Sequence, residues 1–284
     1  MATSAPTLLK EHACFQGVQG FYRHESRTIG LPMQFGVYRP PQAERGPVPV
    51  LLFLAGLTCN EETFAIKAGA QQHAARHGLM LVTPDTSPRG TGIAEADASW
   101  DFGTGAGFYL DASQAPWRAH WRMASYIVDE LLDLVGRHFP ARTDRLGVCG
   151  HSMGGHGALT LALRHPGVFR SVSALAPIAA PSQCAWGRKA FEGYLGADPE
   201  AWHRHDAVEL IRAGARAPHL LVDQGLSDSF LADGQLHPER LESACLEAGQ
   251  ALTLRRHEGY DHGYYFIASF VADHLAHHAQ ALCT

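Results

Sequence analysis

Short apolar runs that alternate with longer segments of helical spacing constrain the fold of this chain more than any other sequence feature. Apolar runs of strand length without alternation are typical of strands that are buried on both faces of a sheet. The pattern therefore predicts an α/β fold, with a mostly parallel central sheet and helices on both faces. No linker, repeat or low-complexity segment interrupts the series, so residues 1–284 are expected to form a single domain.

The expected elements also indicate where chemistry should be sought. MQFGVYRP at 33–40 alternates apolar and polar residues, as an antiparallel strand does. The other expected strands are mostly of the buried type and span 48–56, 79–85, 145–150, 171–177, 219–225 and 252–259. Helical spacing occurs over 63–77, 120–138, 154–165, 237–248 and 264–280. Ligands bind beyond the carboxyl ends of the strands in an open α/β sheet, so residues just after each strand are the first candidates.

Charge and hydropathy argue against several classes of partner. The net charge is -5 and the basic residues are scattered, which predicts no nucleic-acid surface. The N-terminal residues lack the basic and apolar regions of a signal peptide, and no run reaches the roughly 18 apolar residues of a membrane span. We therefore expect a soluble cytoplasmic protein without a membrane partner.

Cysteine and histidine usage favours neither disulfides nor a metal. The six cysteines are spread along the chain without close pairs, which predicts reduced thiols. His73 and His77 are one helical turn apart, but the glutamate of the HExxH zinc motif is missing. Most of the 18 histidines are explained by solvated helix faces, so no metal and no cofactor is expected.

GVCGHSMGGHGAL, at 147–159, places Ser152 between an expected buried strand and an expected helix. A Gly-x-Ser-x-Gly sequence at such a turn is typical of a nucleophile whose backbone is strained and whose hydroxyl projects. Gly150 and Gly154 would prevent clashes with the strand and the helix. The alternative is a glycine-rich helix start that Ser152 caps, but it predicts no catalytic partners later in the chain.

A serine hydroxyl needs an imidazole to accept its proton and a carboxylate to orient that imidazole. In folds with this turn the chain order is serine, acid, histidine. LLVDQGLSDSF offers two acids: Asp223 at the strand end and Asp228 in the following loop. A side chain in the loop can reach across to the histidine, so Asp228 is preferred over Asp223.

RRHEGYDHGYYF offers the base. His262 lies after the last strand and before a helix, whereas His257 is still at the strand end, so His262 is preferred. His151 is next to Ser152, but adjacent side chains diverge on a sharp turn. We expect His151 to be a packed residue of the turn and not the base.

Attack on a carbonyl also requires backbone N–H donors for the oxyanion. The turn places the Met153 N–H, and LAGLTCN places Leu57 directly after Gly56, in a loop that follows a strand. Leu57 and Met153 are therefore the candidate donors of an oxyanion hole. The alternative is that AGLT forms a plain turn.

Several stretches together resemble the S-formylglutathione hydrolases, or esterase D family: GLTCNEETF, DTSPRG, GAGFYLDA, GHSMGGHGAL, WGRKAFEGYLG, DQGLSDSFLADGQL and GYDHGYYFIASFVADH. The resemblance covers nearly the whole chain. It implies an α/β-hydrolase fold and a cytosolic, metal-independent thioesterase, usually a homodimer. The implied reaction is hydrolysis of the small molecule S-formylglutathione to formate and glutathione, in formaldehyde detoxification.

The same resemblance places Ser152, Asp228 and His262 on the family's catalytic triad and Leu57 and Met153 on its oxyanion donors. It also implies that Cys59 lies near the site and can make activity sensitive to thiol reagents. Gly263 departs from the pattern, because a serine often stands there.

Two other functions remain open from the sequence. A general carboxylesterase with a preference for small acyl groups would use the same triad, and a binding module that had lost catalysis would normally lack a triad member. The residues that contact glutathione stay unassigned; polar or aromatic candidates near the strand ends are Lys67, Trp100, Trp186 and Lys189.

Overall fold

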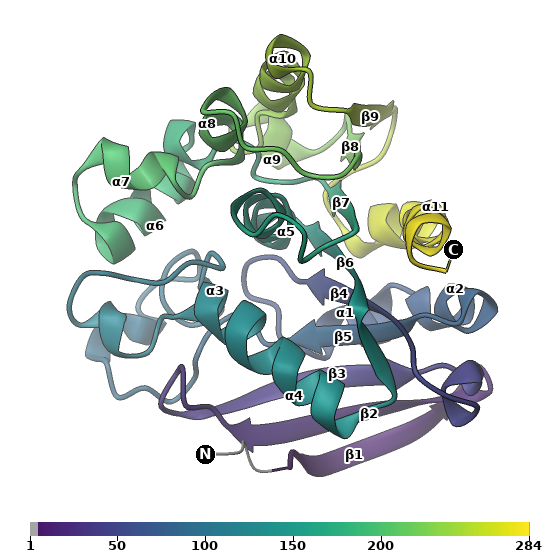
Figure 1. Cartoon of the computed structure of the whole chain (residues 1–284). Helices are drawn as coiled ribbons and strands as arrows, with labels where there is room; N and C mark the ends of the chain where they lie inside the picture. Colours follow the sequence, from purple (N-terminus) through teal and green to yellow (C-terminus); the bar gives the residue numbers. More distant parts are fainter. Residues whose placement is uncertain (1–4, 284) are drawn as a thin grey trace.

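The strands found in the described part of the chain all belong to one sheet (Figure 1). The computed structural model describes residues 5–283, and in this part of the chain the sheet has nine strands in the order β1-β2-β3-β5-β4-β6-β7-β8-β9. The pairs from β5 through β4, β6, β7 and β8 to β9 are parallel, whereas β1, β2, β3 and β5 pair antiparallel. The predicted mostly parallel sheet is confirmed.

The strands are β1 (Thr7–Cys14), β2 (Gly17–Glu25), β3 (Pro32–Arg39), β4 (Val48–Leu54), β5 (Met80–Pro84), β6 (Ala141–His151), β7 (Ser171–Leu175), β8 (Leu220–Gly225) and β9 (Leu252–His257). Every strand expected from the sequence is present as β3 to β9, and β3 is antiparallel to both neighbours as its alternation predicts. The sequence analysis missed β1 and β2. The residues of β1 are exposed except for half-buried Cys14, so this strand has no buried face to produce an apolar pattern.

The helices are α1 (Thr63–Lys67), α2 (Ala70–His77), α3 (Met123–Ser125), α4 (Leu132–His138), α5 (Met153–Arg164), α6 (Ala185–Leu195), α7 (Pro199–His203), α8 (Ala207–Arg212), α9 (Ser229–Ala232), α10 (Pro238–Ala248) and α11 (Tyr264–Leu282). A π-helical segment, η4 (Tyr126–Leu131), joins α3 to α4. Short 3₁₀ turns are η1 (Pro41–Glu44), η2 (Ala94–Asp97), η3 (Trp117–Ala119) and η5 (Pro181–Gln183).

Three helix predictions, 154–165, 237–248 and 264–280, match α5, α10 and α11 closely. Two others need correction. The segment 63–77 forms two helices, because Gly69 adopts a left-handed backbone with φ 66° and ends the first helix. The segment 120–138 becomes helical only at Met123 and contains the π-helical turn. The sequence analysis did not predict α6 to α9.

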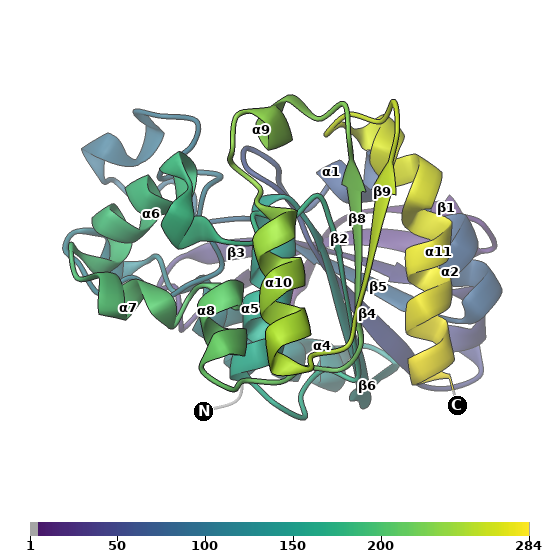
Figure 2. The ribbon, with the colours of Figure 1, turned by 90° about the horizontal axis from the view of Figure 1, so that it is seen from above.

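Helices cover both faces of the sheet, as predicted (Figures 1 and 2). On one face lie α3, α4 and α5, with α8 and α10 packed beyond them; on the other lie α2 and α11, which contact each other. Helix α5 is the most deeply placed, since every residue from Met153 to Leu163 is buried. This sandwich fixes the Ser152 end of α5 against the sheet.

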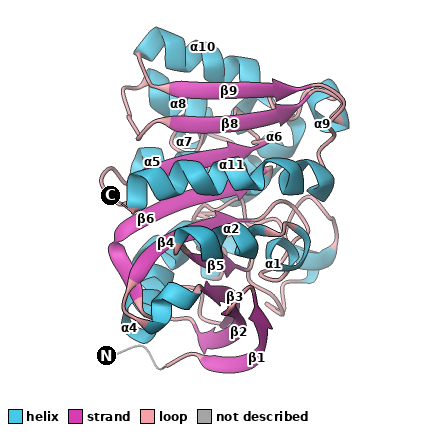
Figure 3. Ribbon diagram, turned by 90° about the vertical axis from the view of Figure 1, so that its right-hand side faces the viewer, coloured by secondary structure: helices cyan, strands magenta, loops and turns pink. Residues whose placement is uncertain are grey.

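Figure 3 shows α1 and α9 at the edge of the sheet toward which the arrows of β8 and β9 point. The loops that follow the parallel strands β4, β6, β8 and β9 meet at this edge, which is where an open α/β sheet binds its ligands. In the described part of the chain no helix combines the length and the apolar character needed to cross a membrane.

Candidate active site

Ser152 lies on a sharp turn between the last residue of β6 and the first of α5. Its backbone has φ 57° and ψ -119°, a conformation that non-glycine residues rarely adopt. A Cβ at Gly150 would lie 2.0 Å from the carbonyl oxygen of Gly154, and one at Gly154 would lie 1.9 Å from that of Leu54. Both glycines are therefore sterically required by the turn that the sequence predicts.

The turn is held by its own backbone. The Ser152 N–H donates to the carbonyl of Leu175 (3.0 Å), and the Ser152 carbonyl accepts from the N–H of Ile178 (3.2 Å). Within residues 5–283 the Ser152 side chain makes no capping hydrogen bond to α5. The capping role considered as an alternative for this serine is thus not what the geometry provides.

Asp228 and His262 are joined by a short hydrogen bond. His262 Nδ1–H donates to Asp228 Oδ2 at 2.6 Å, and the Asp228 side chain is fully buried. Asp228 also caps α9 by accepting from the Phe230 N–H (2.8 Å) and accepts from Gln224 Nε2 (3.2 Å). With Nδ1 fixed as the donor, the neutral ring has Nε2 free to accept a proton.

Asp223 has other partners. Its buried carboxylate accepts from Nε and Nη2 of Arg255, each at 2.6 Å, and from Nε2 of His274 at 3.2 Å. Burial alone would raise the pKa of Asp223, but the hydrogen bonds and charges of His274 and Arg255 hold it below its ordinary range. His257 Nε2 is 3.3 Å from this carboxylate. Asp223 and His257 therefore belong to one cluster, apart from the Asp228–His262 pair.

His151 positions the loop that carries His262. Its Nε2–H donates to the His262 carbonyl at 3.0 Å, and the two rings are 4.5 Å apart. Burial lowers the pKa of His151 well below the ordinary histidine value, so the ring is neutral. As expected, His151 is a packed residue of the turn, but the sequence did not indicate its bond to the His262 backbone.

The loop after β4 packs directly against the Ser152 turn. A Cβ at Gly56 would lie 3.2 Å from both Ser152 Cβ and His151 Nδ1, so glycine permits this close approach. The structure thus brings Leu57, the next residue, beside the turn, while Met153 is fully buried at the start of α5. The first N–H groups of a helix have no partner within that helix, which leaves the Met153 N–H available as a donor.

The segment DTSPRG, at 85–90, holds the loop after β4 through hydrogen bonds to its backbone. The Cys59 carbonyl accepts from Thr86 Oγ1 (2.6 Å) and from Arg89 Nη2 (3.2 Å). Arg89 also donates to the buried Asp85 through Nε (2.6 Å) and Nη2 (2.9 Å). Burial, together with the charge of Asp85, raises the pKa of nearby Glu61 to about 7. Sequence reasoning did not predict this support for the loop.

A pocket of about 170 Å³ opens at this point. Its walls contain Ser152, His262, Leu57 and Cys59, so the structure brings together residues that the sequence singled out in three separate segments. The remaining lining residues are Gly56, Thr58, Trp100, His151, Trp186 and Phe230.

Of the residues considered for glutathione, Trp100 and Trp186 line the pocket and the two lysines do not. Lys189 forms an ion pair with Asp101, and Lys67 Nζ lies 5.5 Å from the ring centre of Tyr264.

Cys59 and Gly263 are the two positions that the sequence marked as special. Burial raises the pKa of the Cys59 thiol, an effect that hydrogen bonds with Tyr264 and Thr63 and the charge of Lys67 only partly offset. Gly263 has an extended backbone, and its N–H donates to Asp261 Oδ1 at 2.9 Å. Because any residue can adopt this backbone, the missing serine does not alter the course of the loop.

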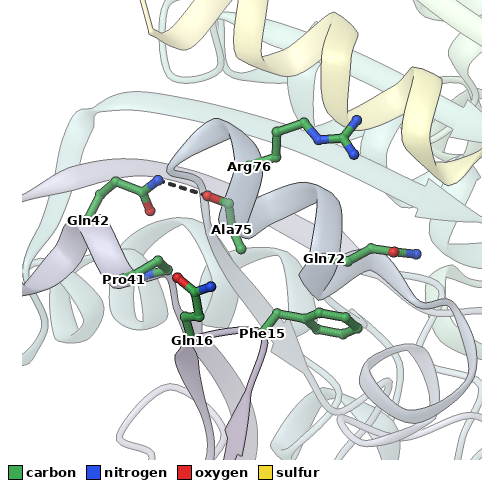
Figure 4. Close-up of a pocket in the computed structure, with 7 residues that line it drawn as sticks. All are labelled: Phe15, Gln16, Pro41, Gln42, Gln72, Ala75 and Arg76. Carbon is green, nitrogen blue, oxygen red and sulfur yellow. Dashed lines mark hydrogen bonds between the residues drawn. The ribbon is translucent and has the colours of Figure 1, made fainter.

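A larger pocket lies elsewhere, between the β1–β2 turn, η1 and α2 (Figure 4). Its volume is about 400 Å³, and one of its edges is closed by a hydrogen bond from Gln42 Nε2 to the Ala75 carbonyl (2.8 Å). Its walls contain glutamines, Arg76 and Phe15, but no serine, cysteine, histidine or carboxylate. It therefore offers no nucleophile or base. Among residues 5–283, no group of three or more His, Cys, Asp or Glu side chains is arranged to hold a metal ion.

Comparison with known proteins agrees with this geometry. A family model described as putative esterase matches residues 26–277. The S-formylglutathione hydrolase of Mus musculus is 50% identical over 275 residues, which is 96% of this chain and 98% of the relative. The chain belongs to the S-formylglutathione hydrolase family of esterases. The S-formylglutathione hydrolase of Bos taurus is 51% identical to this chain over 271 residues, which is 95% of this chain and 96% of the relative.

Solved structures of related proteins have a similar fold. An S-formylglutathione hydrolase from Agrobacterium tumefaciens matches with a TM-score of 0.95 and 47% identity over 97% of this chain and 99% of that one. A ferulic acid esterase matches with a TM-score of 0.72 and 19% identity over 93% and 98% of the two chains, which shows a shared fold alone. The chain is a serine hydrolase with the α/β-hydrolase fold, as the sequence predicts.

Proposed function

We propose that this chain hydrolyses S-formylglutathione to formate and glutathione, and so acts in formaldehyde detoxification. The observation that carries the proposal is its 50% identity, over 96% of the chain, to a relative of that name. The pocket that contains Ser152 and His262 supports it, because this pocket gives a thioester access to the proposed nucleophile and base.

In the proposed first half-reaction, Ser152 Oγ attacks the formyl carbon while His262 Nε2 accepts the hydroxyl proton. Asp228 keeps the imidazole in the required tautomer and stabilises the imidazolium. The N–H groups of Leu57 and Met153 stabilise the oxyanion of the tetrahedral intermediate. The carbon–sulfur bond then breaks, glutathione leaves with the proton from His262, and Ser152 carries the formyl group as an ester.

The second half-reaction returns the enzyme to its starting state. His262 removes a proton from a water molecule, whose oxygen attacks the Ser152 formyl ester. The same two N–H donors stabilise the second oxyanion. When the bond to Ser152 Oγ breaks, His262 returns the proton to that oxygen, and formic acid is released and loses its remaining proton to the solvent to become formate. Each step uses only side chains and backbone groups of this chain together with water.

Residues 1–284 are proposed to form a single domain that works in the cytoplasm as a homodimer. The homodimer and the location rest on the family resemblance alone. The single domain is supported by the continuous sheet of nine strands among the described residues. Analytical ultracentrifugation of the purified chain tests the dimer, because sedimentation as a monomer at micromolar concentration would contradict it.

Steady-state kinetics test the substrate. We expect kcat/KM to be higher for S-formylglutathione than for S-acetylglutathione, and higher than for the formyl thioester of 2-mercaptoethanol. Binding energy from the remote glutathione part can be used in the transition state, so its removal should lower kcat as well as raise KM. Equal values for the two formyl thioesters, or faster turnover of butyryl aryl esters, would favour a general carboxylesterase instead.

A further inference from the structure

A row of aromatic side chains begins at His262 and runs to the mouth of the pocket. Phe230 packs edge-on against His262 with ring centres 4.9 Å apart, and Trp186 packs against Phe230 at 4.7 Å. Trp100 meets Trp186 edge to face at 5.4 Å. All four side chains line the pocket that contains Ser152. The row therefore forms one wall of that pocket, built from α9, α6 and the turn around residue 100.

Trp100, at the outer end of the row, is 54% exposed. It is nevertheless held in place, because the neighbouring Asp101 forms an ion pair with Lys189 and accepts a hydrogen bond from Ser99. Lys189 Nζ also donates to Ser99 Oγ at 2.8 Å. Lys189 lies on α6 three residues after Trp186, so these contacts fix the Trp100 turn to the helix that carries Trp186. The wall is thus preformed, which lowers the entropy cost of binding.

The chemistry of the proposed reaction places the leaving group along this wall. His262 must give its proton to the leaving sulfur, so that sulfur lies beside the imidazole. The aromatic row starts in contact with His262 and leads outward to the exposed Trp100, so a large leaving group that begins beside His262 can lie along it.

We propose that Trp100 and Trp186 bind the thiol part of the substrate and set the preference for a peptide thiol over a small one. This inference rests on the proposed function. The flat peptide groups and the cysteinyl methylene of glutathione match an aromatic wall, since such surfaces pack against indole faces with little loss of side-chain entropy. Trp100 and Trp186 take no part in proton transfer, so they are substrate-binding residues.

The test compares two formyl thioesters, those of glutathione and of 2-mercaptoethanol. Trp100→Ala should lower kcat/KM for S-formylglutathione by about tenfold, the range of an aromatic packing contact. It should leave kcat/KM for the small thioester unchanged, and Trp100→Phe should restore most of the loss. Phe15→Ala is the matched control, because Phe15 is also an aromatic residue, is 52% exposed and lines the separate pocket of Figure 4. It should change neither value.

Binding of S-methylglutathione, which has no ester bond to hydrolyse, tests the wall independently of turnover. It should quench tryptophan fluorescence in the wild type, with a Kd about tenfold higher in Trp100→Ala. Equal losses for both thioesters would overturn the proposal in favour of a structural role. A changed preference among acyl chains would overturn it in favour of an acyl pocket. A wild type that shows no preference for S-formylglutathione would contradict the proposed function, whereas the S-methylglutathione titration would still decide the inference.

Discussion

Two aspartates near the end of β8 are both buried, but they contact different side chains and so have different roles. Asp228 meets the single imidazole of His262, whose second nitrogen is free for proton transfer. Asp223 forms a bidentate ion pair with the guanidinium of Arg255. This group is always charged and cannot act as a base. Asp228 is therefore placed to orient the proposed base, whereas Asp223 forms an ion pair within the fold.

We predict that substitution separates these two roles. Asp228→Asn should lower kcat by about 10⁴-fold, because the amide favours the wrong tautomer of His262. Asp223→Asn should leave kcat near the wild-type value but destabilise the fold by about 3 kcal/mol, because it breaks a buried ion pair. Turnover and thermal unfolding of both variants provide the measurement. The reverse pattern would assign the catalytic acid to Asp223.

Ser152→Ala provides the second prediction. The variant should fold, because the backbone contacts of the turn do not involve the hydroxyl. Its kcat should fall by about 10⁴-fold or more, since the covalent route is lost while the oxyanion donors remain. Circular dichroism would show whether the variant is folded, and an assay of formate release would measure its kcat. Substantial remaining turnover in a sample free of wild-type enzyme would rule out Ser152 as the nucleophile.

Cys59 gives a prediction about inhibition. It lines the pocket, so a group attached to its sulfur should block the substrate by bulk. Because burial raises the pKa of this thiol, inactivation by N-ethylmaleimide should be slow near neutral pH and faster as the pH rises. Cys59→Ser should remain active and resist the reagent. Equal inactivation of wild type and variant would place the sensitive thiol elsewhere, with exposed Cys283 as the first candidate.

At the residue scale, the sequence predicted those site residues whose position follows from their order along the chain. Ser152, Asp228 and His262 follow their strands in the expected order, and the latter two are in contact. Nothing in the sequence indicates that Arg255 faces Asp223, because this contact depends on the register in which β8 pairs with β9. The bond from His151 to the His262 backbone likewise depends on two distant loops meeting.

At the scale of elements, the loop after β4 depends on a neighbouring segment for its shape. The Thr58 N–H donates to the Gly105 carbonyl at 2.9 Å, and Thr58 has φ 68°, an unfavourable value for a β-branched residue. Thr86 and Arg89 hold the next carbonyl, that of Cys59. A loop fixed on both sides can aim the Leu57 N–H without reorganising during the reaction.

Arg89→Met tests this support. Loss of the cation removes one of the two donors to the Cys59 carbonyl and leaves Asp85 buried without its cationic partner, so the loop should become less well fixed. If the Leu57 N–H acts only in the transition state, kcat should fall by about tenfold while KM stays unchanged. Arg142→Met, which breaks an exposed ion pair with Asp144, is the matched control. A rise in KM at constant kcat would instead indicate a role in substrate binding.

Most of the predicted elements have a buried face, and most of the missed ones are short or exposed; β2 and α6 are exceptions, because both have buried residues and were missed. The strands β4, β7 and β8 and helix α5 are buried along almost their whole length and were predicted within a few residues. By contrast, α7 and α9 span five and four residues, too few to show a helical period. Their helical form depends on the aspartate caps Asp198 and Asp228 and on tertiary packing.

At the scale of the whole molecule, the sheet and its two helix layers followed from the alternation of apolar runs. What the sequence could not give was the order of strands. The antiparallel addition of β1, β2 and β3 beyond β5 depends on which edge of the sheet is left open. The expectation that solvated helix faces explain most of the histidines is wrong: His151, His156, His274 and His278 are buried, and their neighbours come from distant elements.

These histidines make the stability of the whole molecule depend on pH. Burial lowers the pKa of His156 to about 4 and of His205 to about 3, and holds those of His151 and His278 well below the ordinary value of 6.5. As the pH falls below 6.5, the unfolded chain binds protons at these positions and the folded chain does not. Each such group then removes up to about 1.4 kcal/mol of stability per pH unit.

Glu61 acts in the opposite sense. Burial and the charge of Asp85 raise its pKa from 4.5 to about 7, so the folded chain binds a proton here that the unfolded chain has already released. Between these two values its ionisation destabilises the fold as the pH rises. The stability that Glu61 gains on acidification offsets the loss from about one histidine. Acidification should therefore still lower the stability of the fold overall.

We therefore predict that the thermal unfolding midpoint falls by several degrees between about pH 7.5 and about pH 5, well above the pKa of the buried Asp223. His278→Gln should make this fall shallower, because it removes one titrating group. A glutamine amide can still donate to and accept from the hydroxyls of Ser171 and Ser173, which lie 2.6 and 2.8 Å from the His278 ring nitrogens. Calorimetry at matched ionic strength measures both slopes, with the exposed-site variant Leu246→Ala expected to keep the wild-type slope. A midpoint that is constant over this range, or an unchanged slope in His278→Gln, would show that the buried histidines do not control acid stability.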